Sequence, residues 1–235
     1  MTTRRRLSRR LAFGLMTALL ISTAAPAMLS AQTAKPAAAA SGLSNNPGAD
    51  APEVKKAEAY LNNLRTLKAR FVQTDNSGRR MTGDFLLKRP GRMRFQYDPP
   101  ATDFIVADGL FVHYYDGQMK QQSSAPIGQS LANFFLRAEI GFTKDLRIET
   151  IGRDASGRMT ITVTQAKDPL SGAITIIFNE SDKGDLSLAG WRVLDPQGLT
   201  TDVALEQAQE GIKLGNDQFH YYDPCLLYTS PSPRD

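Results

Sequence analysis

The chain has 235 residues, with 28 lysine and arginine side chains against 24 aspartate and glutamate side chains, and one cysteine, Cys225. Five of the basic and none of the acidic side chains fall within residues 1–31, which leaves 23 basic against 24 acidic side chains in the remainder. Since nucleic-acid binding depends on a basic surplus, this balance argues against a nucleic-acid partner. A single cysteine provides neither a disulfide framework nor a thiolate metal cluster.

Residues 1–31 have the pattern of a cleavable secretory signal peptide. Five arginines precede an apolar stretch from Leu11 to about Thr23, which is too short to span a bilayer. Small residues favour cleavage after Ala31, and Ser8-Arg9-Arg10 keeps twin-arginine export open as the minor route. No cysteine follows the signal, where lipid attachment would need one. We therefore expect a periplasmic protein that is released without a membrane anchor.

The rest of the chain divides into three parts. Residues 32–51 are rich in Ala, Pro, Ser and Asn, which predicts a flexible leader. Residues 52–224 carry the periodic patterns of one folded domain. Residues 225–235, which include the cysteine, do not continue these patterns and resemble a translated adapter sequence.

The domain begins with a predicted amphipathic helix over about residues 52–66, because Val54, Ala57, Leu61 and Leu64 recur at helical spacing. From Leu67 onward the period is two, which predicts strands. Residues 104–107 and 110–115 flank an Asp-Gly pair and predict a hairpin. Later strands are expected at 146–153, 159–165, 173–179, 188–195 and 200–208.

One segment interrupts the strands. Residues 126–140 hold an apolar stripe that Ser130 could cap, which predicts a second helix lying across a face or mouth of the sheet. Roughly ten strands joined by short turns predict one antiparallel sheet that curls on itself. Two helices can cover such a sheet tightly as a solid core or loosely as a lid over a cavity. The pattern leaves both arrangements open.

The stretch 83–100 carries the candidate site. Phe85 and Leu87 share parity with Arg89, so an inward-facing row of apolar side chains would end in a guanidinium. A guanidinium keeps its charge and, if buried, needs acceptors for its donors. The alternative is a strand-end arginine that the Pro90-Gly91 turn directs to solvent. The following strand places Met93, Phe95 and Tyr97 on one face.

The sequence gives catalysis little support. His113 and His220 are the chain's two histidines, and neither lies in a metal-ligand spacing. The sequence contains no Gly-rich phosphate loop and no nucleophile elbow. We therefore expect neither an enzyme nor a metal or cofactor. An envelope hydrolase is the least favoured alternative.

Five features follow one another along the domain: the helix, the run Leu67-x-Ala69-x-Phe71-x-Gln73, the Gly83–Pro90 stretch with its Lys-Arg-Pro motif, Arg94-Phe95-x-Tyr97, and the Asp108-Gly109 hairpin. In their order and spacing, these features resemble the LolA family of periplasmic outer-membrane lipoprotein carriers. The resemblance covers about residues 53–224. It implies a mainly β fold with helices, an incompletely closed antiparallel β-barrel covered by a helical lid.

The resemblance also implies a function. Such a protein carries acylated lipoproteins from an inner-membrane ATP-driven release complex to an acceptor lipoprotein at the outer membrane, and we expect it to act as a monomer. Arg89 would hold the lid through backbone carbonyls. Lipid would contact a set made of Phe85, Leu87, Arg89, Met93, Phe95 and Tyr97, with Leu131, Phe134 and Phe135 in the lid. Two alternatives stay open: a carrier of another lipid, or a non-enzymatic envelope interaction module with a solid core. Trp191 is expected in the core.

Overall fold

The computed structural model describes residues 48–129, 133–142 and 145–222 of the chain. Within these residues, eleven strands form one antiparallel sheet. The strands are β1 (Thr66–Asp75), β2 (Arg80–Lys88), β3 (Arg92–Tyr97), β4 (Phe104–Asp108), β5 (Phe111–Asp116), β6 (Gln121–Pro126), β7 (Leu146–Arg153), β8 (Met159–Gln165), β9 (Ala173–Glu180), β10 (Leu186–Leu194) and β11 (Thr200–Glu210).

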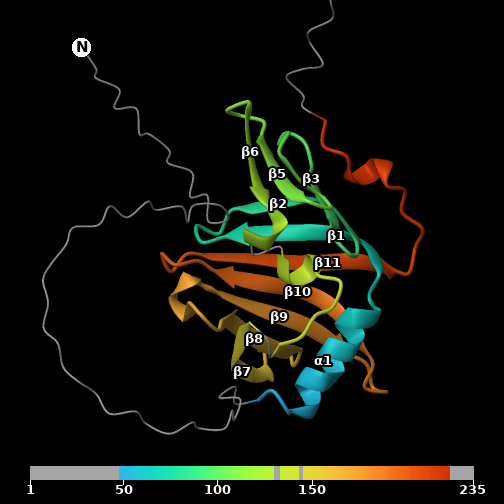
Figure 1. Ribbon diagram of the computed structural model, residues 1–235, viewed down its shortest axis with the longest axis vertical. Coiled ribbons are helices and arrows are strands. Elements are labelled where there is room, and N and C mark those ends of the chain that lie inside the picture. The colour runs from blue at the N-terminus through green and yellow to red at the C-terminus, as the bar shows by residue number, and fades with distance from the viewer. Residues whose placement is uncertain (1–47, 130–132, 143–144, 223–235) are drawn as a thin grey trace, which may run out of the picture.

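The sheet curls around one interior without closing. Its strand order is β6-β5-β4-β3-β2-β1-β11-β10-β9-β8-β7, so β6 and β7 remain as edges. The pairing of β1 with β11 joins the N-terminal half of the sheet to the C-terminal half, as Figure 1 shows. Buried apolar side chains from both halves belong to a single cluster. The predicted curled, incompletely closed antiparallel barrel is confirmed.

The first helix, α1 (Pro52–Asn63), crosses the inner side near one end of the strands (Figure 1). Pro52 suits its first turn, because the missing N–H would have no partner there. Val54, Ala57 and Leu61 are at most 1% exposed and form its buried stripe. The helix ends at Asn63 and not near residue 66 as predicted, because Thr66 already pairs with β2 in the sheet.

The helix predicted within residues 126–140 is present but shorter than expected. The described part holds a single 3₁₀ turn, η1 (Ile127–Gln129), and a four-residue helix, α2 (Asn133–Leu136). The chain bends after α2, where Arg137 O and Ala138 O accept hydrogen bonds from the Arg89 guanidinium. The prediction also missed β6, whose first four residues are polar and exposed, so that no apolar alternation marks it as a strand.

After β11 the chain crosses the outer face of the sheet. The 3₁₀ turn η3 (Asp217–Phe219) of this segment lies against β3 and β4. Lys88 Nζ donates to Leu214 O at 2.7 Å and holds this segment in place. A further 3₁₀ turn, η2 (Pro169–Ser171), lies between β8 and β9. The predicted signal peptide (1–31), most of the leader (32–47), the tail (225–235) with Cys225, and the lid candidate Leu131 lie outside the described residues.

Candidate functional site

The predicted row of apolar side chains lies together on the inner face of β2 and β3. The register pairs Phe85 with Phe95 and Leu87 with Met93. These four side chains are between 1% and 6% exposed. Tyr97 continues the row at 7% exposed. The parity argument therefore placed all five on the correct face.

Tyr97 gives the row a polar end. Its hydroxyl donates to Gln73 Oε1 at 2.7 Å, which satisfies the one polar atom of a buried ring. Burial, with a smaller contribution from the charge of Asp103, raises the pKa of Tyr97 above its ordinary value. The hydroxyl is therefore neutral at physiological pH.

The row continues into a larger group of rings in which Trp191 of β10 is central. Its ring centroid lies 5.5 Å from that of Phe85, 6.0 Å from that of Phe95 and 4.9 Å from that of Phe135. Trp191 thereby connects the two halves of the sheet to α2. It is buried, as expected for core, but its contacts make it part of the site. Sequence reasoning missed that role because the partners come from three distant segments.

The lid candidates of α2 face the same interior. Phe134 and Phe135 are 4% and 7% exposed. Their rings pack edge to face with centroids 5.0 Å apart, and Phe134 also contacts Phe142 at 5.5 Å. In this conformation, the buried Phe134 and Phe135 side chains of α2 occupy space next to the inner face of the sheet, where Phe135 contacts Trp191 of β10.

Arg89 lies at the end of β2, is 7% exposed and turns inward. Its guanidinium is bonded to backbone carbonyls. Nη1 donates to Leu61 O and to Leu64 O, the second at 3.3 Å. Nε and Nη2 donate to Arg137 O at 3.1 and 2.6 Å, and Nη2 also donates to Ala138 O at 3.4 Å. The alternative of a solvent-directed arginine is wrong.

These acceptors explain why a charge can lie there. The last carbonyls of a helix have no partner inside the helix and carry partial negative charge. The last turn of α1 contains no basic residue of its own, and Arg89 from β2 supplies the positive charge. Burial, with a smaller effect from the neighbouring charge of Arg65, lowers the pKa of Arg89 to about 10. The guanidinium therefore remains charged at neutral pH.

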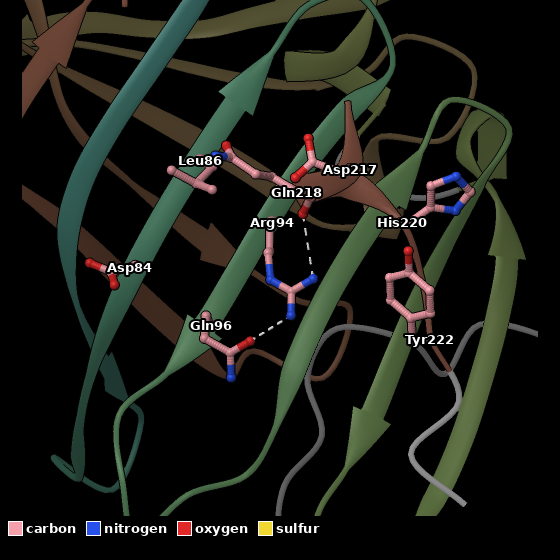
Figure 2. Close-up of a pocket in the computed structure, with 8 residues that line it drawn as sticks. All are labelled: Asp84, Leu86, Arg94, Gln96, Asp217, Gln218, His220 and Tyr222. Carbon is pink, nitrogen blue, oxygen red and sulfur yellow. Dashed lines mark hydrogen bonds between the residues drawn. The ribbon is translucent and has the colours of Figure 1, made fainter. Parts of the chain in front are cut away.

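A groove of about 430 Å³ lies on the outer face of the sheet, between β2–β3 and the segment after β11 (Figure 2). Its lining is mostly polar or charged: Asp84, Leu86, Arg94, Gln96, Asp217, Gln218, His220 and Tyr222. Arg94 donates to Gln96 Oε1 at 2.7 Å and lies over the Phe104 ring at 5.3 Å. Burial lowers the pKa of Arg94. The groove lies on the opposite face of β2 and β3 and shares none of its lining residues with the inner apolar row, so it is separate from the apolar site.

One side-chain arrangement bears on the hydrolase alternative. His113 Nδ1 lies 2.8 Å from Ser124 Oγ, and His113 Nε2 lies 3.0 Å from Asp108 Oδ2. The ring of His113 stacks on Tyr221, with centroids 4.7 Å apart. Asp108, His113 and Ser124 do not line the outer groove. The contacts of His113 join β4, β5, β6 and the C-terminal segment.

Within the described residues, no group of three or more His, Cys, Asp or Glu side chains could hold a metal ion. Over the same residues, none of the helices combines the length and hydropathy that a membrane crossing needs.

Comparison with known proteins places the chain in a family. The model of the family described as outer membrane lipoprotein carrier protein LolA matches residues 62–222. The chain belongs to the LolA family. The Lys88-Arg89-Pro90 motif, α2 and Trp191 lie inside the matched range, whereas most of α1 precedes it.

Curated LolA-family relatives match over most of their own length. The outer-membrane lipoprotein carrier protein of Methylococcus capsulatus is 29% identical over 176 residues, covering 72% of this chain and 82% of the relative. That of Legionella pneumophila strain Paris is 28% identical over 177 residues, covering 71% and 84%. A solved LolA superfamily protein from Nitrosomonas europaea aligns with a TM-score of 0.38 at 11% identity, over 72% of this chain and 97% of that chain.

Proposed function

We propose that this protein is a periplasmic carrier that binds the acyl chains of lipoproteins between the inner face of its sheet and its helical cover. It takes lipoproteins from an inner-membrane ATP-driven release complex and delivers them to an acceptor lipoprotein at the outer membrane. The carrier performs no chemical step. Membership of the LolA family and the names of the curated relatives support this proposal.

The observation that carries the proposal is the position of Arg89. It is a buried charge whose acceptors lie on the two segments that cover the apolar side chains. Because Arg89 bonds to both segments, loss of its hydrogen bonds would loosen the cover without breaking the strand pairing of the sheet. The aromatic side chains below it, with Phe85 and Trp191 at the centre, provide an apolar surface for hydrocarbon once the cover lifts.

The free energies of acyl-chain burial and of hydrogen bonding show why such a cover is useful. Each buried methylene contributes about 0.8 kcal/mol, so several long acyl chains bind strongly and cannot travel free in water. Strong binding alone would keep the cargo from leaving. Hydrogen bonds to a charged group contribute roughly 1.5–3 kcal/mol, and they form only in the closed, empty state. They therefore offset part of the affinity and leave the cargo transferable.

The Arg89→Leu variant tests this function. Without the guanidinium the closed state is less stable, so we expect the variant to bind a triacylated lipoprotein but to transfer it to the acceptor about tenfold or more slowly. The measurement is the rate of transfer of a fluorescent lipoprotein from the loaded carrier. Arg65→Leu, which removes a nearby exposed charge, is the control and should transfer at the wild-type rate. Unimpaired transfer by Arg89→Leu would refute the proposed role.

A further inference from the structure

The outer groove holds a cation that no carboxylate of the described chain neutralises. Arg94 lines the groove and is only partly exposed. Its guanidinium donates to Gln96 Oε1 at 2.7 Å and to Gln218 O at 3.5 Å, and it lies over the Phe104 ring. These partners are neutral, and within the described residues no aspartate or glutamate lies at ion-pair distance from Arg94. The charge of Arg94 is therefore uncompensated.

Two other arginines on strands of the sheet do have a carboxylate partner. Arg70 on β1 pairs with Asp98, and Arg192 on β10 pairs with Asp202. In both cases the carboxylate raises the pKa of the arginine, whereas burial lowers the pKa of Arg94. A charge that is partly withdrawn from water without a counter-ion is costly. An anion supplied by a ligand would therefore be stabilised beside Arg94.

The strand side of the groove holds the guanidinium in a fixed orientation. Leu86 of β2 pairs with Arg94 of β3, and Asp84 pairs with Gln96. These four side chains lie along one side of the groove, as Figure 2 shows. A guanidinium has more N–H donors than the two hydrogen bonds of Arg94 use, and its planar fork matches the two oxygens of a carboxylate.

The segment after β11 forms the other side of the groove with Asp217, Gln218, His220 and Tyr222 (Figure 2). Tyr222 is 64% exposed, and its ring centroid lies 5.8 Å from that of His220. Such a ring offers an apolar surface to a ligand in the groove. Since Asp217 also lines the groove, a ligand with one negative charge fits better there than a dianion such as phosphate.

We propose that the outer groove binds an acidic segment of a partner polypeptide, with one carboxylate on Arg94 and a neighbouring apolar side chain against Tyr222. The groove is open between two segments of the chain, and Gln96 and Gln218 supply side-chain amides for a peptide backbone. Residues 32–47 contain no aspartate or glutamate, so this part of the chain does not supply the carboxylate. The site goes beyond the carrier function, because a polypeptide bound on the outer face leaves the inner face free for acyl chains.

Two peptides test this site on the unmodified protein. They are the acetylated and amidated pentapeptide Gly-Phe-Glu-Gly-Gly and the same peptide with Gln in place of Glu. The NMR signals of the Arg94 Nε–H group and of the Gln96 and Gln218 side-chain amides report binding. We expect saturable shifts with the Glu peptide and an affinity about tenfold or more above that of the Gln peptide, because a charge-assisted hydrogen bond is lost. No saturable shift, or equal affinities, would overturn the proposal.

A variant of the protein assigns the binding to one side chain. Arg94→Gln should weaken binding of the Glu peptide about tenfold or more. Arg92→Gln is the matched control, because Arg92 lies on the same face of β3 and does not line the groove. It should leave the affinity within about twofold. Undiminished binding by Arg94→Gln would overturn the site. If Arg94→Gln does not fold, the comparison of the two peptides on the wild type still decides.

Two small anions identify what carries the carboxylate. Propionate has the carboxylate without a peptide, and inorganic phosphate has a different anion geometry and charge. We expect both to bind about tenfold or more weakly than the Glu peptide. Propionate that binds as tightly as the peptide would overturn a polypeptide occupant, and phosphate that does so would overturn the preference for a carboxylate.

A fluorescent fatty acid separates the groove from the proposed carrier function. Saturation of the protein with this probe should change the affinity for the Glu peptide by less than about twofold, because the two sites lie on opposite faces of β2 and β3. A tenfold loss would overturn a separate site. If the protein takes up no fatty acid, the carrier function fails, whereas the peptide titrations still decide the groove.

Discussion

Gly83 is the point of closest approach between β2, β3 and the Phe71 ring. It pairs with Phe71 on β1 and with Tyr97 on β3. A Cβ added there would lie 2.6 Å from Phe71 Cε1 and would also strike the backbone carbonyl of Gln96. The missing side chain lets this ring lie beneath the row of site residues.

We therefore expect Gly83→Ala to lower the free energy of unfolding by about 1–3 kcal/mol, because the ring or the strand must shift. Urea unfolding measures the change. Gly128→Ala is the control, since an added Cβ meets nothing within 4 Å there. It should change the free energy by no more than about 0.5 kcal/mol. A Gly83→Ala protein as stable as the wild type would show that the ring packs more loosely than the structure indicates.

The direction of Arg89 shows how far single residues could be predicted. Its parity with Phe85 and Leu87 pointed inward, but the pattern could not exclude a turn to solvent. The deciding acceptors, Leu61 O and Arg137 O, lie 28 and 48 positions away along the chain. Strand alternation indicates which side chains lie on the same face of the sheet. It does not indicate which other parts of the chain pack against that face.

Among the elements, strands with clear alternation were predicted closely, and β7 and β8 have the expected bounds. The polar edge strand β6 was missed, because with both faces exposed no apolar period remains. The second helix was predicted too long. The spacing of its apolar residues is equally compatible with a short helix that is followed by an irregular buried segment. Such a segment depends on Asn62 and Arg89 for its backbone hydrogen bonds, which sequence periodicity does not report.

Asp98 joins three strands at the end opposite Arg89, and it makes stability depend on pH. It accepts hydrogen bonds from Arg70 of β1 and, at 2.5 Å, from Thr82 of β2. The Arg70 guanidinium, and next the Thr82 hydroxyl, hold the pKa of Asp98 below its ordinary value. A carboxylate with a lowered pKa in the folded state stabilises above about pH 4 and loses that effect as the pH falls through the folded pKa.

Asp98→Asn should therefore lose less stability than the wild type between about pH 5 and pH 2, although it is less stable at neutral pH. The measurement is the urea midpoint as a function of pH. Asp182→Asn, in the exposed β9–β10 turn, should reproduce the wild-type dependence. An acid dependence of Asp98→Asn that matches the wild type would rule out this carboxylate as a contributor.

The two faces of the sheet carry different features. Its inner face carries the aromatic group and the cover held by Arg89, and its outer face carries the polar groove and the segment that Lys88 holds. Lys88 and Arg89 are adjacent, and they fix opposite faces at the same strand end. If the inner face is the cargo site, acyl chains must replace Phe134 and Phe135 beside Trp191.

Trp191 makes this requirement directly measurable, because it is the single tryptophan of the chain. Its intrinsic fluorescence therefore reports on the interior alone. The measurement is a titration of the protein with fatty-acyl chains that carry bromine, a short-range quencher, along the hydrocarbon. We predict saturable quenching of Trp191 by the brominated chains and none by the unbrominated ones. Binding of the brominated chains without any loss of Trp191 fluorescence would contradict a cargo site on the inner face.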